Sequence, residues 1–408
     1  MQLLLPPALT TLLDQHPDTV APEAMLGDGW LTAVTGRITG LLEQAEPHLL
    51  AAGSRAVPGH TMLLLADLTG THPAIYLRLP DGTPAAFHTA AHTSITLPLT
   101  GTLNLALYRD GTDVGNAQPQ YLRALRPGQV VVVHAGATVG LSGGLDTAQI
   151  VLTHHPLAPA EYQVAAKEAR ARLADPTPAE QATGCVWPAG GVTGGWLGDV
   201  PDLRTVDLAT FHAQADVLDH LAGDRNLLTY LATSAIYDPE RFAASRTTLL
   251  LDRIVLCAAE DRGFEIRLNT NPHPGNQRLP HDHAYSFTAR VLTGGYLHVV
   301  HRRTNGRDSG PFASCDITPA VTTTEVPGSS YTLAPTLVHQ ALILPDTTTL
   351  MLRGPYTSTA CAADDLIPPV STWPAPIDSA PPVHSRAMTD DEHLALQRDL
   401  VAAGVIDG

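Results

Sequence analysis

The sequence predicts a mainly β protein with helical additions, built around two barrels of similar construction. Residues 62–152 and 254–356 both consist of short apolar runs separated by Gly, Pro, Asp and Thr, a pattern typical of antiparallel sandwiches and barrels. The chain also contains 33 Gly and 34 Pro in 408 residues, which favours turns and short strands over a helical bundle. Spacings of glycine and histidine that recur in the two stretches indicate a duplication.

Changes in composition divide the chain into four parts. In the first part, Trp30, Val34 and Ile38 recur at helical spacing and predict a helix over 22–52. In the last part, Thr389 and Glu392 form the pattern of a capping box, so a short C-terminal helix should follow. The parts are an N-terminal helix with a degenerate barrel (1–156), a helical linker region (157–250), a second barrel that carries the candidate site (251–362), and an extended tail with the C-terminal helix (363–408).

Charge and cysteine content argue against several classes of protein. Asp and Glu (40) outnumber Lys and Arg (24) and give a net charge of −16, so a nucleic-acid partner is not expected. No apolar run approaches about 18 residues, so no membrane span is expected. The first residues lack the basic region of a signal peptide. The four cysteines form no CxxC pair, which indicates a reduced, cytoplasmic protein.

The duplication is visible as a constant offset between chemically similar positions. The pairs are Gly82 and Gly275, His88 and His281, and Gly101 and Gly294, each 193 residues apart. Farther along, Gly128 and Gly328 open two further segments of similar texture. Several matching spacings within matching β texture indicate that one β domain was duplicated.

The second β stretch contains a cluster of histidines with the spacing of metal ligands. Side chains alternate along a strand, so His281 and His283 should point to the same face and could bind one metal together. A third ligand must come from another strand, and His339 lies within the apolar run LVHQALIL. A histidine inside a barrel strand needs a polar reason to be there, and metal ligation would supply one. The alternative is that the three are ordinary hydrogen-bonded strand histidines.

These residues resemble the two motifs of the cupin superfamily. The first motif is a glycine, five residues, HxH, three or four residues, a glutamate, six residues and a glycine. Gly275, His281, His283 and Gly294 match it in place. The resemblance covers 254–356 well and 60–155 weakly, and it implies a bicupin with two jelly-roll (double-stranded β-helix) barrels.

The second cupin motif is a glycine, five residues, PxG, two residues and a histidine. Gly328 and His339 match it, whereas Ala334 stands in place of the proline and Thr336 in place of the second glycine. The resemblance therefore implies that His281, His283 and His339 are the metal ligands.

One position departs from the first motif. The glutamate falls on Phe287 or, with the longer spacing, on Thr288, and neither side chain can replace a carboxylate ligand. The implied site has three histidines and resembles that of the three-histidine thiol dioxygenases. The expected cofactor is one divalent metal, Fe(II) first, with Zn, Ni, Mn and Cu as alternatives because imidazole binds them too.

The first β stretch has lost most of these residues. His88 occupies the first ligand position, but Ala90, Ser94 and Val139 stand where the second histidine, the glutamate and the distant histidine would be. His92 and His134 could build a different site with His88, or all three could be ordinary polar residues, which we favour. The first barrel would then be structural, or would form a domain interface or a homodimer.

Other residues of the second barrel are candidates for contacts with the substrate. Tyr285 and Phe287 share the face of the histidines and should line the pocket, unless they are simply core. His298 could contact the substrate or be a fourth ligand, but a place at the surface or behind a ligand fits its position better. Arg267, Arg290 and Arg353 could bind a carboxylate. A strand arginine usually faces solvent, however, and Arg290 should point away from His281 and His283.

The function that we expect is that of a mononuclear metal oxygenase acting on a small polar molecule, with dioxygen as co-substrate. A metal-dependent isomerase, lyase or hydrolase is the first alternative, and a non-catalytic small-molecule-binding bicupin is the second. The identity of the metal and oxygen uptake would distinguish the three.

Overall fold

The computed structural model describes residues 55–57, 60–66, 74–80, 88–90, 93–109, 119–143, 148–153, 206–248, 251–259, 263–271, 279–366 and 385–408. Contacts divide the chain into two compact units, 1–184 with 319–324, and 185–318 with 325–408. The helix expected at 22–52, the residue His92 and the motif glycines Gly82 and Gly275 lie outside the described residues.

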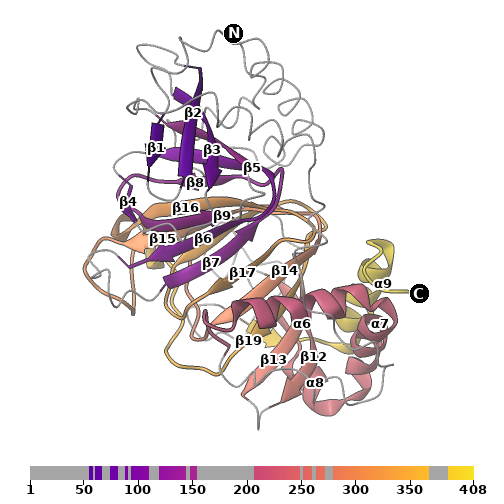
Figure 1. The fold of residues 1–408 in the computed structure, drawn as a ribbon. Helices are drawn as coiled ribbons and strands as arrows, with labels where there is room; N and C mark the ends of the chain where they lie inside the picture. Colours follow the sequence, from indigo (N-terminus) through magenta and orange to yellow (C-terminus); the bar gives the residue numbers. More distant parts are fainter. Residues whose placement is uncertain are drawn as a thin grey trace. The chain divides into compact units, whose positions relative to one another are not determined.

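The described part of the first unit consists of strands, and the expected mainly β class is confirmed (Figure 1). One sheet has the order β1-β2-β3-β10-β5-β8-β16 and the other has the order β7-β6-β9-β4. The strands are β1 (Arg55–Val57), β2 (His60–Ala66), β3 (Ala74–Pro80), β4 (His88–Thr89), β5 (Ser94–Thr100), β6 (Leu103–Tyr108), β7 (Pro119–Leu125), β8 (Val131–Val133), β9 (Thr138–Gly143) and β10 (Ala148–Thr153). Residues 319–324 of β16 (Ile317–Glu325) pair with β8 and belong to this unit.

The second unit combines strands with helices. One sheet has the order β20-β11-β12-β13-β19-β14-β17, and β15 pairs with β18. The strands are β11 (Arg246–Thr248), β12 (Asp252–Ala259), β13 (Phe264–Thr270), β14 (Phe287–Thr293), β15 (Tyr296–Arg303), β17 (Ser330–Leu333), β18 (His339–Ile343), β19 (Thr348–Arg353) and β20 (Ser385–Ala387). The helical segments are α6 (Phe211–Gly223), α7 (Arg225–Ser234), η3 (Ala235–Tyr237), α8 (Pro239–Ala244), η6 (Ser314–Asp316), η7 (Asp364–Leu366) and α9 (Asp390–Ala402).

The two units repeat the same strand pairing, which supports the duplication read from the sequence. The series β2-β3-β10-β5-β8 of the first unit corresponds to β12-β13-β19-β14-β17 of the second, and the pair β6-β9 corresponds to β15-β18. Local contacts repeat as well: Gly136 N donates to Ala90 O at 2.7 Å, and Thr336 N donates to His283 O at 3.0 Å. The same arrangement of strands therefore underlies both units.

Helices cover one face of the sheet in the second unit (Figure 1). Alternation along β13 turns Phe264, Ile266 and Leu268 toward the buried cluster that Val217 and Leu221 of α6 also join. The same alternation turns the polar residues of β13 to the opposite face. As the sequence predicts, α9 begins after Thr389, whose hydroxyl accepts from Glu392 N in a capping box.

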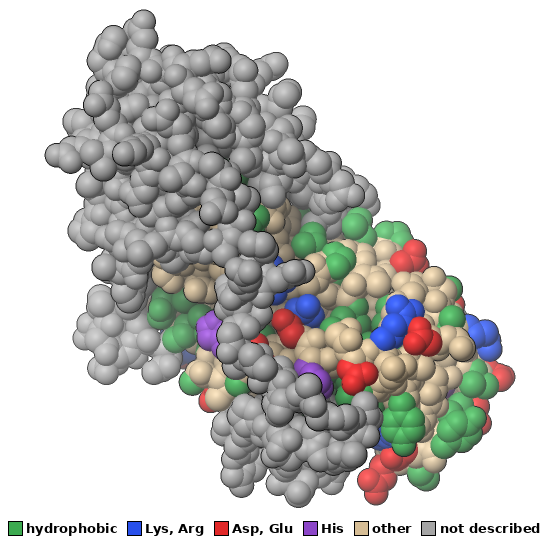
Figure 2. Space-filling view, turned by 45° about the vertical axis from the view of Figure 1, so that its right-hand side comes forward, with side chains coloured by type: hydrophobic (Ala, Val, Ile, Leu, Met, Phe, Trp, Pro, Cys, Tyr) green, Lys and Arg blue, Asp and Glu red, His purple; other side chains and the backbone are tan. Residues whose placement is uncertain are grey.

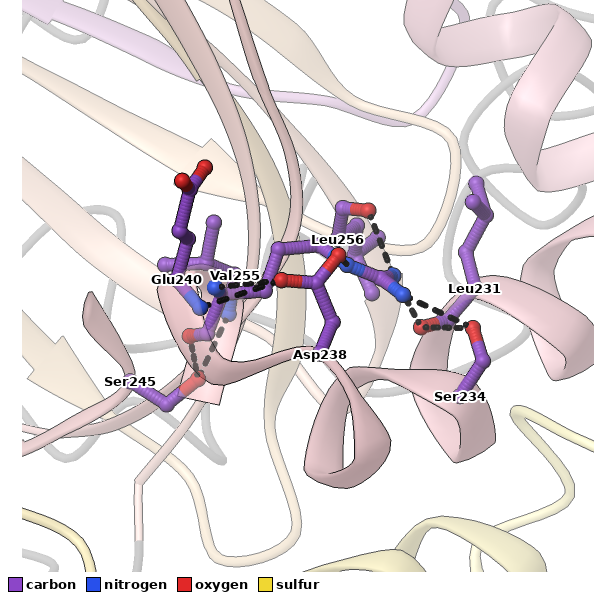
Figure 3. Close-up of polar contacts among 8 residues, drawn as sticks. Leu231, Ser234, Asp238, Glu240, Ser245, Val255 and Leu256 are labelled. Atoms are coloured by element: carbon purple, nitrogen blue, oxygen red, sulfur yellow. Dashed lines mark hydrogen bonds and ion pairs between the residues drawn. The ribbon is translucent and has the colours of Figure 1, made fainter. Parts of the chain in front are cut away.

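A partly buried hydrogen-bond network attaches α8 to β12 (Figure 3). Arg241 donates to Leu256 O at 3.1 Å and to Leu231 O at 3.2 Å, and its Nε lies 2.9 Å from Asp238 Oδ2. Ser245 Oγ donates to Arg241 O at 2.9 Å and accepts from Val255 N at 3.1 Å. These bonds fix the position of β12 beside the candidate site.

The described surface carries mixed charge. On the face shown in Figure 2, basic side chains lie among acidic and apolar ones. Among the described helices, none has the length and apolar character needed to cross a membrane.

Candidate metal centre and adjoining pocket

Backbone pairing brings the three predicted ligands together. His281 and His283 precede β14, and His339 is the first residue of β18. His281 and His339 form an isolated β-bridge, in which each N–H donates to the other carbonyl at 2.9 and 2.8 Å. Asp282, between the two histidines, is buried and accepts from Arg303 Nη2 at 2.7 Å and from Cys361 N at 2.6 Å. The loop that carries the HxH segment is therefore held from both sides.

The ring nitrogens of the three histidines form a compact group. One nitrogen from each of His281, His283 and His339 lies within 4.8 Å of the others, and Nε2 of His283 is 2.9 Å from Nε2 of His339. Metal–imidazole bonds are about 2.0–2.1 Å long, so two such nitrogens bound to one ion at right angles would be separated by about 3 Å. The group fits one divalent ion.

Hydrogen bonding sets the tautomer of His281. Its Nδ1 lies 2.9 Å from Leu279 O, and because a carbonyl can only accept, Nδ1 carries the proton. The lone pair of His281 Nε2 is then available for a metal.

Burial keeps all three imidazoles neutral. It lowers the pKa of His281 to about 4. Burial together with the neighbouring histidine His281 holds the pKa of His283 and that of His339 well below their usual value. Neutral imidazole is the form that binds metals, so at neutral pH no proton has to leave before coordination.

His298 is fully buried behind His339, which excludes the surface position considered for it. Its Nε2 lies 2.9 Å from His339 Nδ1, and its Nδ1 lies 3.8 Å from Oε1 of Glu325, which is also fully buried. The carboxyl group of Glu325 thus adjoins the imidazole of His298, which in turn adjoins the imidazole of the proposed ligand His339. Such partners fix the orientation of a ligand and raise its basicity. Glu325 was not predictable from the sequence, because it follows a polar run of threonines and no motif contains it.

Phe287 lies where the cupin glutamate would be. Its ring centroid is 4.7 Å from that of His283 and 5.9 Å from that of His339, and the side chain is fully buried. The ring centroid of Tyr285 lies 5.3 Å from that of His283. Both aromatic residues therefore face the histidines, as strand alternation predicts. Thr288 points the other way, because its hydroxyl contacts Gln214 of α6.

Two cavities meet at the histidines. One, of about 60 Å³, is lined by His281, His283 and His339 together with Phe287 and Tyr331. The other, of about 230 Å³, also touches His281 and His283. Its remaining wall is formed by Thr248, Leu251, Arg253, Arg267, Asn269, Asp282, Ala284, Tyr285, Met351, Tyr356, Ala360 and Ser385.

The expectation that a strand arginine faces solvent is wrong for Arg267. Its side chain is only 2% exposed and lies on the pocket side of β13, between Glu265 and Asn269. The apolar alternate residues of β13 face the helices, so the polar face points inward. Arg290 behaves as expected, since it points away from the histidines and pairs with Asp219 of α6. Arg253 and Asn269 are further pocket residues that were not predicted from the sequence; for Asn269, the polar alternate positions of β13 were the available signal.

The first unit does not reproduce the histidine group at its corresponding described positions. His88 pairs with Val139 as His281 does with His339, but Ala90 and Val139 are buried apolar residues. His134 Nε2 lies 3.0 Å from Thr322 Oγ1, an ordinary polar contact.

The mainly β fold, the internal duplication and the three-histidine group are those that the resemblance to bicupins implies. No protein-family model matches the chain, and no curated protein matches its sequence. Among solved structures, an oxalate decarboxylase is similar at 10% identity and a TM-score of 0.22, with 78% of this chain and 79% of the other covered. The Bacillus subtilis oxalate decarboxylase determined at pH 4.6 gives 11% identity, a TM-score of 0.21, and coverages of 79% and 78%. Similarity at this level does not indicate a substrate.

Proposed function

We propose that the chain is a mononuclear metal enzyme of cupin type that oxidises a small polar molecule with dioxygen. His281, His283 and His339 would hold one divalent cation, Fe(II) in this proposal. The observation that carries it is the group of three buried, neutral imidazoles at the junction of two cavities. A bound Fe(II) would supply electrons and a Lewis acid at this point.

The surrounding residues have separate tasks in this proposal. His298 and Glu325 orient His339. Phe287 keeps water and a fourth protein ligand away from the side of His283 that it covers. Tyr285, which lines the larger cavity, would contact the substrate. The ligand set is neutral, so the full charge of the cation remains available to attract an anionic group.

Imidazole ligands also accept Zn, Ni, Mn and Cu, so the choice of Fe(II) needs a direct test. Protein purified without oxygen is analysed for metals, and oxygen uptake is then followed after addition of candidate substrates. Iron with substrate-dependent uptake is the expected result. Zinc without uptake would replace the oxygenase by a Lewis-acid isomerase, lyase or hydrolase. A protein that takes up no metal would be a binding module instead.

A further inference from the structure

The wall of the larger cavity contains two arginines, Arg253 and Arg267, and one carboxylate, Asp282, which is paired with Arg303 at 2.7 Å. Arg253 lies on β12 and Arg267 on β13, and Glu265 of β13 is the carboxylate that Arg267 shares with Arg353 of β19. Arg267 Nε contacts Glu265 Oε1, and Arg353 Nη2 lies 2.7 Å from Glu265 Oε2. Arg253 has no ion pair within the described part of the chain. One carboxylate therefore serves two of three guanidinium groups.

Register explains why these groups gather. Asn269 of β13 pairs with Arg253 of β12, and Glu265 of β13 pairs with Arg353 of β19. Residues directly opposite one another on neighbouring strands point to the same face, and so do alternate residues of one strand. Arg267, between Asn269 and Glu265, completes a polar strip on the face that lines the cavity.

Several donors in this strip have no acceptor. Arg267 is 2% exposed; its Nη1 donates to Tyr285 Oη at 3.0 Å, but its Nη2 has no partner among the described residues. The buried Nε of Arg253 also has no hydrogen-bond partner among the described residues. Buried donors without acceptors, and in particular charged ones, are costly and occur where a ligand or ion supplies the missing partner.

We propose that Arg253 and Arg267 form a binding subsite for the carboxylate of a small organic acid, which reaches from this strip toward His281 and His283. The proposal rests on the proposed function and names the substrate class of the same site. Both histidines line the cavity that contains the two arginines, so one small molecule can touch both ends. A guanidinium fork matches a planar carboxylate with two parallel hydrogen bonds.

The rest of the cavity wall favours an organic acid over an inorganic anion. Leu251, Ala284, Met351 and Ala360 supply apolar surface in the wall of the same cavity. A carbon skeleton can pack there, whereas phosphate would leave this surface without a partner. Burial, together with the charge of Arg267, lowers the pKa of Arg253 to about 10, and a bound carboxylate would relieve this repulsion.

Calorimetric titration of the full chain tests the subsite directly. The probes are the straight-chain dicarboxylates malonate, succinate and glutarate, the uncharged succinamide, and inorganic phosphate. We expect at least one dicarboxylate to bind, and both succinamide and phosphate to bind more weakly than it. Arg253→Gln should weaken its binding about 10- to 100-fold, the usual effect of losing a charged hydrogen-bonding partner. Arg253→Lys keeps the positive charge but lacks the two parallel donors of a guanidinium group. Its affinity for the dicarboxylate should lie between those of the wild type and Arg253→Gln.

The control is Arg290→Gln, on the opposite face of the sheet, which should bind the dicarboxylate as the wild type does. Melting temperatures check that each variant folds, and the lysine variant serves if the glutamine variant does not. The subsite would be disproved by absence of dicarboxylate binding, by equal binding of succinamide or tighter binding of phosphate, or by equal affinity of wild type and Arg253→Gln.

The titration is repeated on protein stripped of metal, because the arginines do not depend on the ion. Carboxylate binding that requires Arg253 in stripped protein would support the subsite even if the metal proposal failed. Normal metal binding without carboxylate binding would disprove the subsite and leave the proposed function intact.

Discussion

In the proposed metal site, His298 is a buried residue that would act on the metal without being a ligand. It lies between His339 and Glu325, and both His298 and Glu325 are fully buried. Through His298, the carboxyl group of Glu325 can make His339 a stronger donor to a metal.

We therefore predict that Glu325→Gln weakens metal binding about 10- to 100-fold, the usual effect of removing such a partner. The glutamine preserves the size of the side chain and replaces the carboxyl group by a neutral amide. Competition with a chelator measures the affinity, and Glu240→Gln, at an exposed position of α8, is the control. Equal metal affinity of Glu325→Gln and wild type would contradict this role.

Phe287 gives a second prediction at this scale. Phe287→Glu places a carboxylate beside His283, where many cupins have one, and should give tighter metal retention with weaker substrate binding and lower turnover. Phe287→Gln, of similar size but without charge, should not gain metal affinity. Melting temperatures with and without metal decide: a drop that metal does not reverse would mean that Phe287 is only core and that the buried charge is unpaired.

At the scale of elements, the turn between β14 and β15 fixes the strand that follows the proposed ligands His281 and His283. Gly294 has φ +67°, and a Cβ at this position would lie 2.7 Å from Thr347 Cα. Thr347 Oγ1 in turn accepts from Gly295 N at 3.0 Å and donates to Leu344 O at 2.8 Å. The glycine of the first cupin motif is thus required by a close approach of two turns.

We predict that Gly294→Ala lowers the free energy of unfolding by more than about 2 kcal/mol, since backbone strain and a steric clash add. Gly306→Ala is the matched control, because Gly306 has φ +72° but nothing lies within 4 Å of the added Cβ. Gly306→Ala should lower the free energy of unfolding by only about 1 kcal/mol. Denaturant titration measures both variants, and equal losses would show that the clash is absent.

Elements also show what the sequence could and could not predict. The strands around His281, His283 and His339 were predictable because apolar alternation and motif spacing agree. The pocket face of β13 was not, because the pattern Glu265, Arg267, Asn269 is the same whether a polar face meets solvent or encloses a cavity. The polar face of β13 encloses a cavity because the helices cover the opposite, apolar face of the sheet. Thr336 has φ +65°, so the backbone of the second cupin motif persists without its glycine.

At the scale of the whole molecule, the first unit retains the strand pairing of the second but has apolar residues at two of the three ligand positions. Residues 319–324 pair with β8, and Val130 N donates to Thr324 Oγ1 at 2.8 Å. A piece of the second half of the sequence is therefore part of the first unit.

Removal of residues 1–160 should accordingly leave β16 without its partner and expose an unpaired strand edge. We predict that the truncated chain aggregates or loses cooperative unfolding, which light scattering and thermal denaturation would measure. A truncated chain that is soluble, folded and as active as the full one would contradict a structural role of the first unit.

The central claim is that His281, His283 and His339 form the metal site of the molecule. The most direct test is the metal content of the full chain and of His281→Ala, His283→Ala and His339→Ala, with His88→Ala of the first unit as the control. We predict about one divalent ion per chain in the wild type and in His88→Ala, and loss of the ion in the other three. Full occupancy in His339→Ala would contradict the claim.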